Sequence, residues 1–414
     1  MTKIKITNKK FHHNIKVLLI GIGGVYNYGC EAIVRGIELI LRSKWPDSKI
    51  IYASLRVEDD RARLNDTSIN IVQRTFNRYS LSNISRKIVS YVGLNWNPRI
   101  DTLNLLKGVD AVFSIGGDIY TLDSFDNYNV SLPRFGNAAE KRRIPYILWG
   151  ASVGPFNKNK KAEKFFSKHL SNISLVAARE NDTIDYLSSI GVSSNVISCA
   201  DPAFVVAPEI LRNCNLVNDK KTIGINLSPL PVRYSGMDLE KTLITQARMV
   251  EQIAKKFNAK VILIPHVVCN FAIDNDDKTY LQKIILKIDR GYKDQIYLID
   301  TDLGFIGVKK ILAQCDLVIA TRMHCAINSI AAFVPTIFIA YSQKAQGMCD
   351  YIYGHRKWVL SLADFSSEKC LTYIGLILKN QKEIQTYLSR RILEVRANAY
   401  APLVVLEKLL SNKV

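Results

Sequence analysis

The sequence predicts an α/β protein built from two Rossmann-like domains that face a central cleft. Over 414 residues, short apolar runs rich in β-branched side chains alternate with segments of helical periodicity, a pattern typical of parallel sheets with crossover helices. A chain of this length exceeds what one hydrophobic core usually supports, so about two domains are expected. The polar stretch 213–221 interrupts the alternation, which restarts at Thr222, and we place the domain boundary there.

The individual elements follow from local periodicity. In the first half, strands are expected at 16–21, 49–54, 109–115, 144–149, 174–178 and 195–199, and helices at 29–42, 158–170 and 181–189. In the second half, strands are expected at 222–226, 259–264, 295–299, 316–320, 335–340 and 356–360. From Ser366 onward the pattern is helical. The chain is therefore divided into residues 1–212, residues 213–365, and helices at 366–414 that pack back across the two domains.

Composition and charge limit the classes of partner. Hydrophobic residues make up 48% of the chain and charged residues 22%, which fits a globular protein and excludes a disordered one. The 56 Lys and Arg against 37 Asp and Glu give a formal charge of +19, which favours acidic partners. The basic residues are dispersed and no recognised nucleic-acid module occurs, so anionic lipids or phosphorylated small molecules are expected rather than nucleic acid.

The eight cysteines and the N-terminus both indicate a cytoplasmic protein. The cysteines form no CxxC pair and no short Cys/His ligand spacing, so free thiols are expected and a metal site is not. The N-terminal residues have no small-residue cleavage site before the first strand, so secretion is not expected.

The uncharged run 325–343 approaches the length of a spanning helix, but Pro335 divides it, and a buried helix, a turn and a buried strand are expected instead.

The most informative motif is Arg322-Met323-His324. It lies where the expected strand 316–320 gives way to a helical segment. Open α/β sheets bind ligands at the carboxyl ends of their strands, and the free amides that begin a helix favour an anion. A guanidinium and an imidazole at this position predict an anion site beside a proton donor.

Three further turns follow predicted strands. The cluster Gly21 to Gly29 lacks the third glycine of a dinucleotide fingerprint, because Tyr26 occupies that position, and no acidic residue ends the second strand. Its expected role is either tight packing or a ligand contact through Asn27 and nearby amides. After strand 109–115, Gly116-Gly117-Asp118 would project a carboxylate into the cleft as a base or a hydroxyl acceptor; the alternative is an aspartate that only caps a helix. Arg179 ends another strand and is either an anion clamp or a surface partner of Glu180.

In the second half, His266 ends the strand 259–264 and is a weak candidate by itself. Asp274, Asp276 and Asp277 follow it and could bind a metal or cap a helix, of which capping is favoured. Lys344 comes soon after the strand 335–340 and would add a cation near the anion held by the Arg322 motif.

These motifs together resemble those of polysaccharide pyruvyl transferases. The resemblance spans roughly residues 15–355, and its motifs occur in the family's order: Asn27-Tyr28-Gly29-Cys30-Glu31-Ala32-Ile33, Gly116-Gly117-Asp118, Ala178-Arg179-Glu180, Arg322-Met323-His324 and Tyr341-Ser342-Gln343-Lys344. It implies a GT-B-like architecture. It also implies transfer of pyruvate from phosphoenolpyruvate to two hydroxyls of a hexose in a surface-glycan precursor, which forms a cyclic ketal and releases phosphate.

The resemblance suggests a role for each candidate residue. Residues 1–212 would form the acceptor side and residues 213–365 the phosphoenolpyruvate site. His324 would protonate the donor's methylene carbon, and Asp118 would orient or deprotonate the attacking hydroxyl. The donor would be held by Arg179, Arg322, Met323 and Lys344. The acceptor would contact Asn27, Gly29 and His266, and neither a metal nor a cofactor is expected.

Two features concern the acceptor. Relatives often carry glutamine after the first glycine of the loop 150–155, where this chain has Ala151, which puts the acceptor's identity in doubt. The segment 67–100 has no acidic residue and carries Arg86 and Lys87 beside apolar residues at helical spacing. This pattern predicts either a helix on anionic lipid, next to a lipid-linked or nucleotide-linked glycan, or an ordinary core-packed helix. A liposome flotation assay that shows no binding would exclude the membrane-peripheral alternative.

Two other functions fit the same residues. A GT-B-type glycosyltransferase could bind the diphosphate of a sugar nucleotide with Arg322 and the helix amides. A non-catalytic protein that binds an anionic glycan would also suit the positive charge, and would tolerate the loss of His324.

Overall fold

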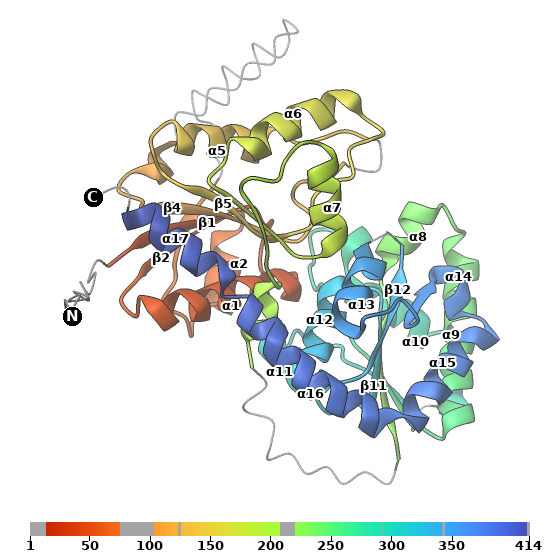
Figure 1. The fold of residues 1–414 in the computed structure, drawn as a ribbon. Helices are drawn as coiled ribbons and strands as arrows, with labels where there is room; N and C mark the ends of the chain where they lie inside the picture. The colour runs from red at the N-terminus through yellow and green to blue at the C-terminus, as the bar shows by residue number, and fades with distance from the viewer. Residues whose placement is uncertain are drawn as a thin grey trace, which may run out of the picture.

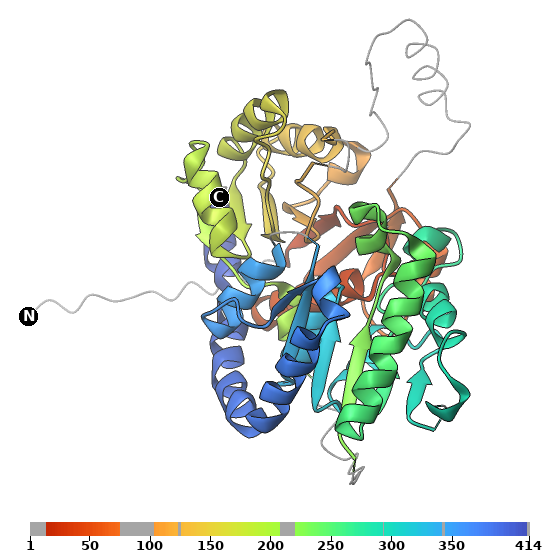
Figure 2. The same cartoon turned by 90° about the vertical axis from the view of Figure 1, so that its right-hand side faces the viewer.

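The computed structural model describes residues 14–74, 103–122, 126–207, 220–292, 294–341 and 344–411. Within these residues each half of the chain forms a parallel β-sheet flanked by helices, and the two sheets belong to separate lobes (Figure 1). The predicted α/β class with two Rossmann-like domains is confirmed. The carboxyl ends of the strands in the two sheets face each other across the boundary between the lobes (Figures 1 and 2).

The described N-terminal sheet has the order β3-β2-β1-β4-β5-β6-β7, and each strand is parallel to its neighbours. The strands are β1 (Lys16–Ile20), β2 (Lys49–Ser54), β3 (Asn70–Gln73), β4 (Ala111–Ile115), β5 (Tyr146–Ala151), β6 (Leu175–Ala178) and β7 (Val196–Ser198). Sequence analysis did not predict β3. It is a four-residue edge strand in which only Ile71 is buried, so it carries almost no periodic signal.

The described C-terminal sheet has the order β10-β9-β8-β11-β12-β13 and is also parallel. The strands are β8 (Thr222–Asn226), β9 (Lys260–Leu263), β10 (Ile296–Leu298), β11 (Leu317–Ala320), β12 (Thr336–Ala340) and β13 (Val359–Ser361). The strand expected at 356–360 begins later, at Val359, because the residues before it form a turn.

Helices connect the strands of each sheet. In the N-terminal domain they are α1 (Tyr28–Lys44), α2 (Val57–Arg63), α5 (Ser131–Glu140), α6 (Lys160–Ser171), α7 (Asn181–Ser189) and the 3₁₀ helices η1 (Asn104–Leu106) and η2 (Pro202–Val205). In the C-terminal domain they are α8 (Pro229–Ser235), α9 (Leu239–Phe257), η4 (Ile273–Asn275), α10 (Asp277–Ile285), η5 (Arg290–Tyr292), α11 (Gly304–Leu312), α12 (Met323–Ile330), α13 (Lys344–Tyr353) and α14 (Leu362–Phe365).

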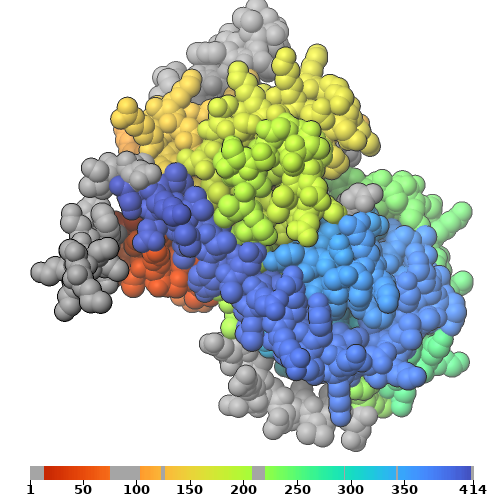
Figure 3. Space-filling view, in the orientation of Figure 1, coloured from red at the N-terminus to blue at the C-terminus, as the bar shows by residue number. Residues whose placement is uncertain are grey.

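The last three helices pass from one lobe to the other. Helices α15 (Glu368–Lys379) and α16 (Gln381–Asn398) lie along the C-terminal domain, and α17 (Ala401–Ser411) packs on the N-terminal domain (Figures 1 and 3). Arg396 of α16 donates hydrogen bonds to the carbonyl of Phe204 (3.0 Å) and to that of Ala331 (2.9 Å). The C-terminal helices therefore tie η2 of one domain to the end of α12 in the other.

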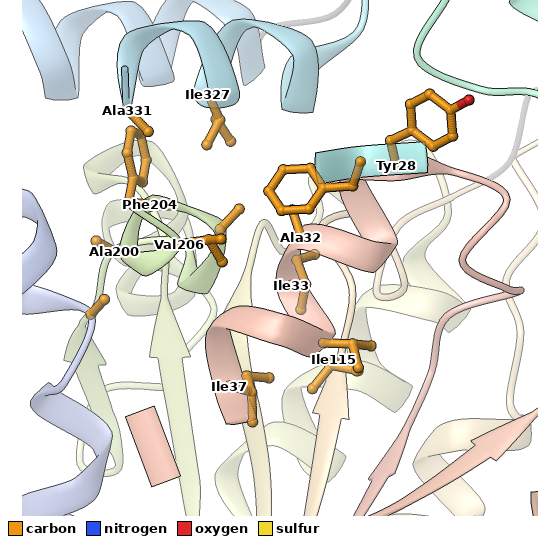
Figure 4. Packing of buried hydrophobic residues seen from close by; sticks show 14 of the residues in the cluster. Tyr28, Ala32, Ile33, Ile37, Ile115, Ala200, Phe204, Val206, Ile327 and Ala331 are labelled. Carbon is orange, nitrogen blue, oxygen red and sulfur yellow. The ribbon is translucent and has the colours of Figure 1, made fainter. Parts of the chain in front are cut away.

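The two domains share one hydrophobic cluster where α1, η2 and α12 meet. Figure 4 shows Ala32 and Ile33 of α1 and Phe204 of η2 in the same packed region as Ile327 of α12, and all of these residues are fully buried. Interiors packed in this way resist small displacements. The shared cluster therefore fixes the starts of α1 and α12 relative to η2, and these three elements frame the site described below.

Within the uncharged run 325–343, the described residues form most of the buried helix α12 and the strand β12. No helix in the described part of the chain is long and apolar enough to cross a bilayer. Most of the basic segment 67–100 lies outside the described residues, so the predicted lipid-binding helix there stays a prediction.

A buried histidine gives the N-terminal domain a predictable response to acid. His169 Nδ1 lies 2.8 Å from Asn137 Oδ1, and Nε2 lies 3.1 Å from the Tyr120 hydroxyl, an arrangement that suits a neutral ring. Burial lowers the pKa of His169 to about 4. Between about pH 6.5 and about pH 4 the unfolded chain therefore binds a proton that the folded chain does not, and stability falls with pH by about 3 kcal/mol. Urea unfolding across this range should show a shallower loss for His169→Gln, and equal slopes would contradict the assignment.

Candidate active site

The carboxyl ends of four strands bring the main candidates to one pocket between the domains. Asp118 follows β4 and Arg179 follows β6 in the first sheet, while His324 follows β11 and Lys344 follows β12 in the second. All four side chains line this pocket, together with Thr321, Met323 and Tyr341. Its volume is 30 Å³, about the space of one water molecule. A substrate must therefore rearrange the side chains that close it.

His324 is held by a buried aspartate. It lies in the first turn of α12, and its Nε2 is 3.1 Å from Asp201 Oδ2. Asp201 is fully buried at the start of η2, where its other oxygen accepts a hydrogen bond from the amide of Ala203 (2.9 Å). Desolvation raises the pKa of Asp201, but the charges of His324 and Arg179 outweigh it and lower the pKa to about 2. The pair is thus an ionised carboxylate that orients an imidazole at the pocket.

Arg179 shares the same carboxylate. Its Nη1 donates to Asp201 Oδ2 (3.0 Å), its Nε to Glu180 Oε2 (3.1 Å) and its Nη2 to Ser152 Oγ (2.6 Å). Desolvation opposes the charge, but Glu180 and Asp201 raise the pKa of Arg179 above its usual value. The residue is 2% exposed, so the arginine is a buried cation of the pocket rather than half of a surface pair.

Asp118 and Lys344 form an ion pair across the domain boundary. Lys344 Nζ donates to Asp118 Oδ1, and 60% of the Asp118 side chain is exposed at the mouth of the pocket. Desolvation raises the pKa of Asp118, but Lys344 and then Arg179 outweigh it and lower the pKa below its usual value. An ionised carboxylate from the N-terminal domain therefore lines the same pocket as His324.

Arg322 lies beside the pocket but does not line it. Its Nε and Nη2 bind the buried carboxylate of Asp277 (3.0 and 2.8 Å), and Nη2 also donates to the Asn275 carbonyl (2.8 Å). The guanidinium thus anchors the start of α12 to the loop before α10. Of the neighbouring acids, Asp276 caps α10 through the Thr279 amide (2.8 Å), which agrees with the favoured interpretation. The described residues contain no group of three or more His, Cys, Asp or Glu placed to hold a metal.

Glycines allow the two domains to approach at His324. A Cβ on Gly29 would lie 2.4 Å from His324 Cβ, and one on Gly117 would lie 2.8 Å from Arg179 Nη1. Asn27 caps α1 by accepting from the Gly29 amide (2.9 Å). His266 is buried behind α12, where its Nε2 lies 3.1 Å from Asn328 Nδ2. Among the three acceptor candidates, Gly29 lies directly against His324, whereas Asn27 caps α1 and His266 bonds to Asn328 of α12.

Sequence analysis missed Asp201 and Ser152. Asp201 precedes Pro202 directly after the expected strand 195–199, which is the same kind of position that drew attention to Asp118 and Arg179. This position after a predicted strand could have identified Asp201 as a candidate. Ser152 lies in a turn to which no chemistry was assigned, and only its contact with Arg179 reveals its role.

The fold and the position of the site define a GT-B-like protein, as predicted. UDP-GlcNAc 2-epimerase from Neisseria meningitidis, solved with UDP-GlcNAc, superposes with a TM-score of 0.60 at 14% identity, over 95% of this chain and 100% of that chain. HepE from Anabaena, solved with UDP and glucose, has a TM-score of 0.57 at 11% identity, over 97% of this chain and 99% of that chain. Identities this low establish the architecture alone.

Comparison of sequences identifies the family, which the structural similarity does not. The model of the family described as polysaccharide pyruvyl transferase matches residues 27–343, so the chain belongs to that family and is a transferase. A similar curated protein is the amylovoran biosynthesis protein AmsJ of Erwinia amylovora. It is 24% identical to this chain in an alignment that covers 92% of this chain and 96% of that protein.

Proposed function

We propose that this transferase moves pyruvate from phosphoenolpyruvate onto two hydroxyls of a hexose in a glycan precursor, with release of phosphate and formation of a cyclic ketal. The observation that carries the proposal is the His324–Asp201 pair beside the pocket cations Arg179 and Lys344. The similarity to a protein of amylovoran biosynthesis supports a polysaccharide precursor as the acceptor.

The donor's two acidic groups suit the charges of the pocket. Phosphoenolpyruvate carries a phosphate and a carboxylate, and Arg179, Lys344 and the first amides of α12 supply cationic or donor groups. Lys344 is now paired with Asp118. On donor binding, we expect Lys344 to exchange Asp118 for the anion, which opens the pocket and frees the carboxylate for the acceptor.

The chemistry starts with proton transfer to carbon. Protonated His324 donates its proton to the methylene carbon, which becomes a methyl group, and the adjacent carbon becomes oxocarbenium-like. The first sugar hydroxyl forms a C–O bond to that carbon and gives its proton to Asp118. The product is a tetrahedral adduct that carries methyl, carboxylate, phosphate and the sugar oxygen.

Ring closure follows loss of phosphate. The C–O bond to phosphate breaks with its electron pair, and the second hydroxyl attacks the same carbon. The proton held by Asp118 passes to the departing phosphate, and the proton of the second hydroxyl restores His324, so both side chains return to their starting state and the protons balance. Asp201 remains ionised throughout and stabilises the imidazolium. The scheme uses no cofactor.

The direct test is product detection. The purified chain is incubated with phosphoenolpyruvate and lipid-linked or nucleotide-linked hexoses, and mass spectrometry together with phosphate release is used to detect the ketal. We expect a mass increase that corresponds to phosphoenolpyruvate minus phosphate, with one phosphate released per ketal. The parallel reaction receives sugar nucleotides without phosphoenolpyruvate. Nucleotide release there, with no ketal across the panel, would instead establish a glycosyltransferase.

A further inference from the structure

Two exposed tyrosines stack on each other and present a surface beside the pocket. Tyr341 follows β12 and lines the pocket, and Tyr234 lies on α8 of the same domain. Their rings are parallel to within 4°, with centroids 6.1 Å apart. Tyr234 is 53% exposed and Tyr341 is 38% exposed. The surface therefore extends from the charged pocket toward solvent on the C-terminal domain.

Neither ring has an evident structural task. Within the described part of the chain, neither hydroxyl makes a hydrogen bond, and each ring leaves a large apolar area in water. Burial and the neighbouring charge of Asp118 raise the pKa of Tyr341 to about 12, so its hydroxyl stays protonated and can donate a hydrogen bond. Sites for small molecules typically combine apolar or aromatic walls with a few polar groups of this kind.

We propose that Tyr234 and Tyr341 bind the acceptor hexose by stacking against the apolar C–H face of its pyranose ring. This rests on the proposed function and adds the acceptor's position to it. Tyr341 and Asp118 line the same pocket, so a sugar bound on the tyrosine pair lies within reach of that carboxylate. In this proposal the surface turns a hydroxyl pair of the acceptor toward the donor carbon. In this arrangement Tyr234 is a positioning residue for the acceptor.

The larger groove on the molecule is less suited to a sugar ring than the tyrosine pair. A groove of 990 Å³ runs between α2 and the loops before α10 and α11, and it contains the exposed Phe271. The face of that ring is already covered by the guanidinium of Arg56, 3.3 Å from its centroid, and its edge by Tyr26. None of the groove residues lines the pocket that holds His324. Substitution of Phe271 therefore serves as a comparison for substitution of Tyr234 in the binding test below.

The test combines sugar binding with donor binding in the full chain. Saturation-transfer NMR is recorded with methyl glycosides of galactose, glucose and mannose, and phosphoenolpyruvate binding is measured by calorimetry. We expect at least one glycoside to bind wild type, and Tyr234→Ala to weaken that binding about five- to tenfold while donor affinity is unchanged. Tyr234→Phe should retain binding because it keeps the ring. Tyr297→Ala, which removes a similarly exposed tyrosine (43%) from β10, should have no effect.

The outcomes separate the two proposals. If no methyl glycoside binds wild type, or if Tyr234→Ala binds as wild type does, the stacking surface is wrong, whatever the donor measurement shows. If Phe271→Ala, rather than Tyr234→Ala, abolishes sugar binding, the acceptor lies in the other groove. If sugar binding depends on Tyr234 but phosphoenolpyruvate neither binds nor reacts, the acceptor surface stands and the proposed donor fails. Thermal unfolding of Tyr234→Ala should match wild type, because the ring is exposed.

Discussion

Replacing His324 with glutamine is expected to lower kcat about a thousandfold and to leave the KM for phosphoenolpyruvate within about threefold of wild type. Glutamine cannot deliver a proton to carbon, but its amide can still donate a hydrogen bond to Asp201, which lies 3.1 Å from the imidazole. The measurement is steady-state phosphate release at saturating acceptor. A loss confined to kcat would assign His324 to the chemical step.

Lys344→Met is the matched comparison for donor binding. It removes a pocket cation without touching the His324–Asp201 pair, so it should raise the KM for phosphoenolpyruvate about tenfold with a smaller change in kcat. If both variants changed kcat and KM in the same proportion, the division between an acid and an anion-binding residue would be lost. If His324→Gln remained fully active, proton transfer by His324 would be excluded.

Asp201→Asn is expected to lower kcat about a hundredfold. The carboxylate accepts from both His324 and Arg179, and the pKa of Asp201, about 2, keeps it ionised at any pH at which the enzyme works. A neutral amide keeps the shape but removes the negative charge that stabilises the imidazolium during proton transfer. The measurement is steady-state phosphate release at saturating donor and acceptor.

Asp276→Asn provides the control for replacing a buried aspartate. Asp276 is 2% exposed and caps α10 outside the pocket that holds His324. Asparagine caps a helix about as well as aspartate, so this substitution should change stability by no more than about 1 kcal/mol and leave kcat unchanged. Circular dichroism and thermal unfolding would verify that both variants fold. An Asp201→Asn enzyme with the wild-type kcat would show that Asp201 only supports the fold.

Much of the site was predictable because each buried parallel strand can be recognised from its own short run of apolar residues. The strands β4, β6 and β11 are buried apolar runs, and the residues that follow them lie at the same type of sheet edge whatever the rest of the chain does. Asp118, Arg179 and His324 could therefore be selected one by one. Asp201 has the same kind of position but follows β7, a three-residue strand with no fully buried residue, so its signal is weak.

The role of Arg322 shows what local pattern cannot supply. Its position at the end of β11 predicted a donor contact, but the guanidinium binds Asp277 and Asn275, from the region where β9 leads into α10. Which partner an arginine selects depends on the neighbours that the sheet order brings alongside it. Strand order is not encoded in the periodicity of any single strand.

Hydrophobic periodicity and turn residues are local properties, so the α/β class, the two-domain organisation and the charged strand ends could be inferred from the chain alone. The pairing of Asp201 with His324, the contact of Asp118 with Lys344 across the domain boundary and the parallel rings of Tyr234 and Tyr341 are visible only in the folded protein. The first two pairings depend on how the domains are oriented. That orientation is set by the packing of α1, η2 and α12, whose contacts join residues far apart in the chain.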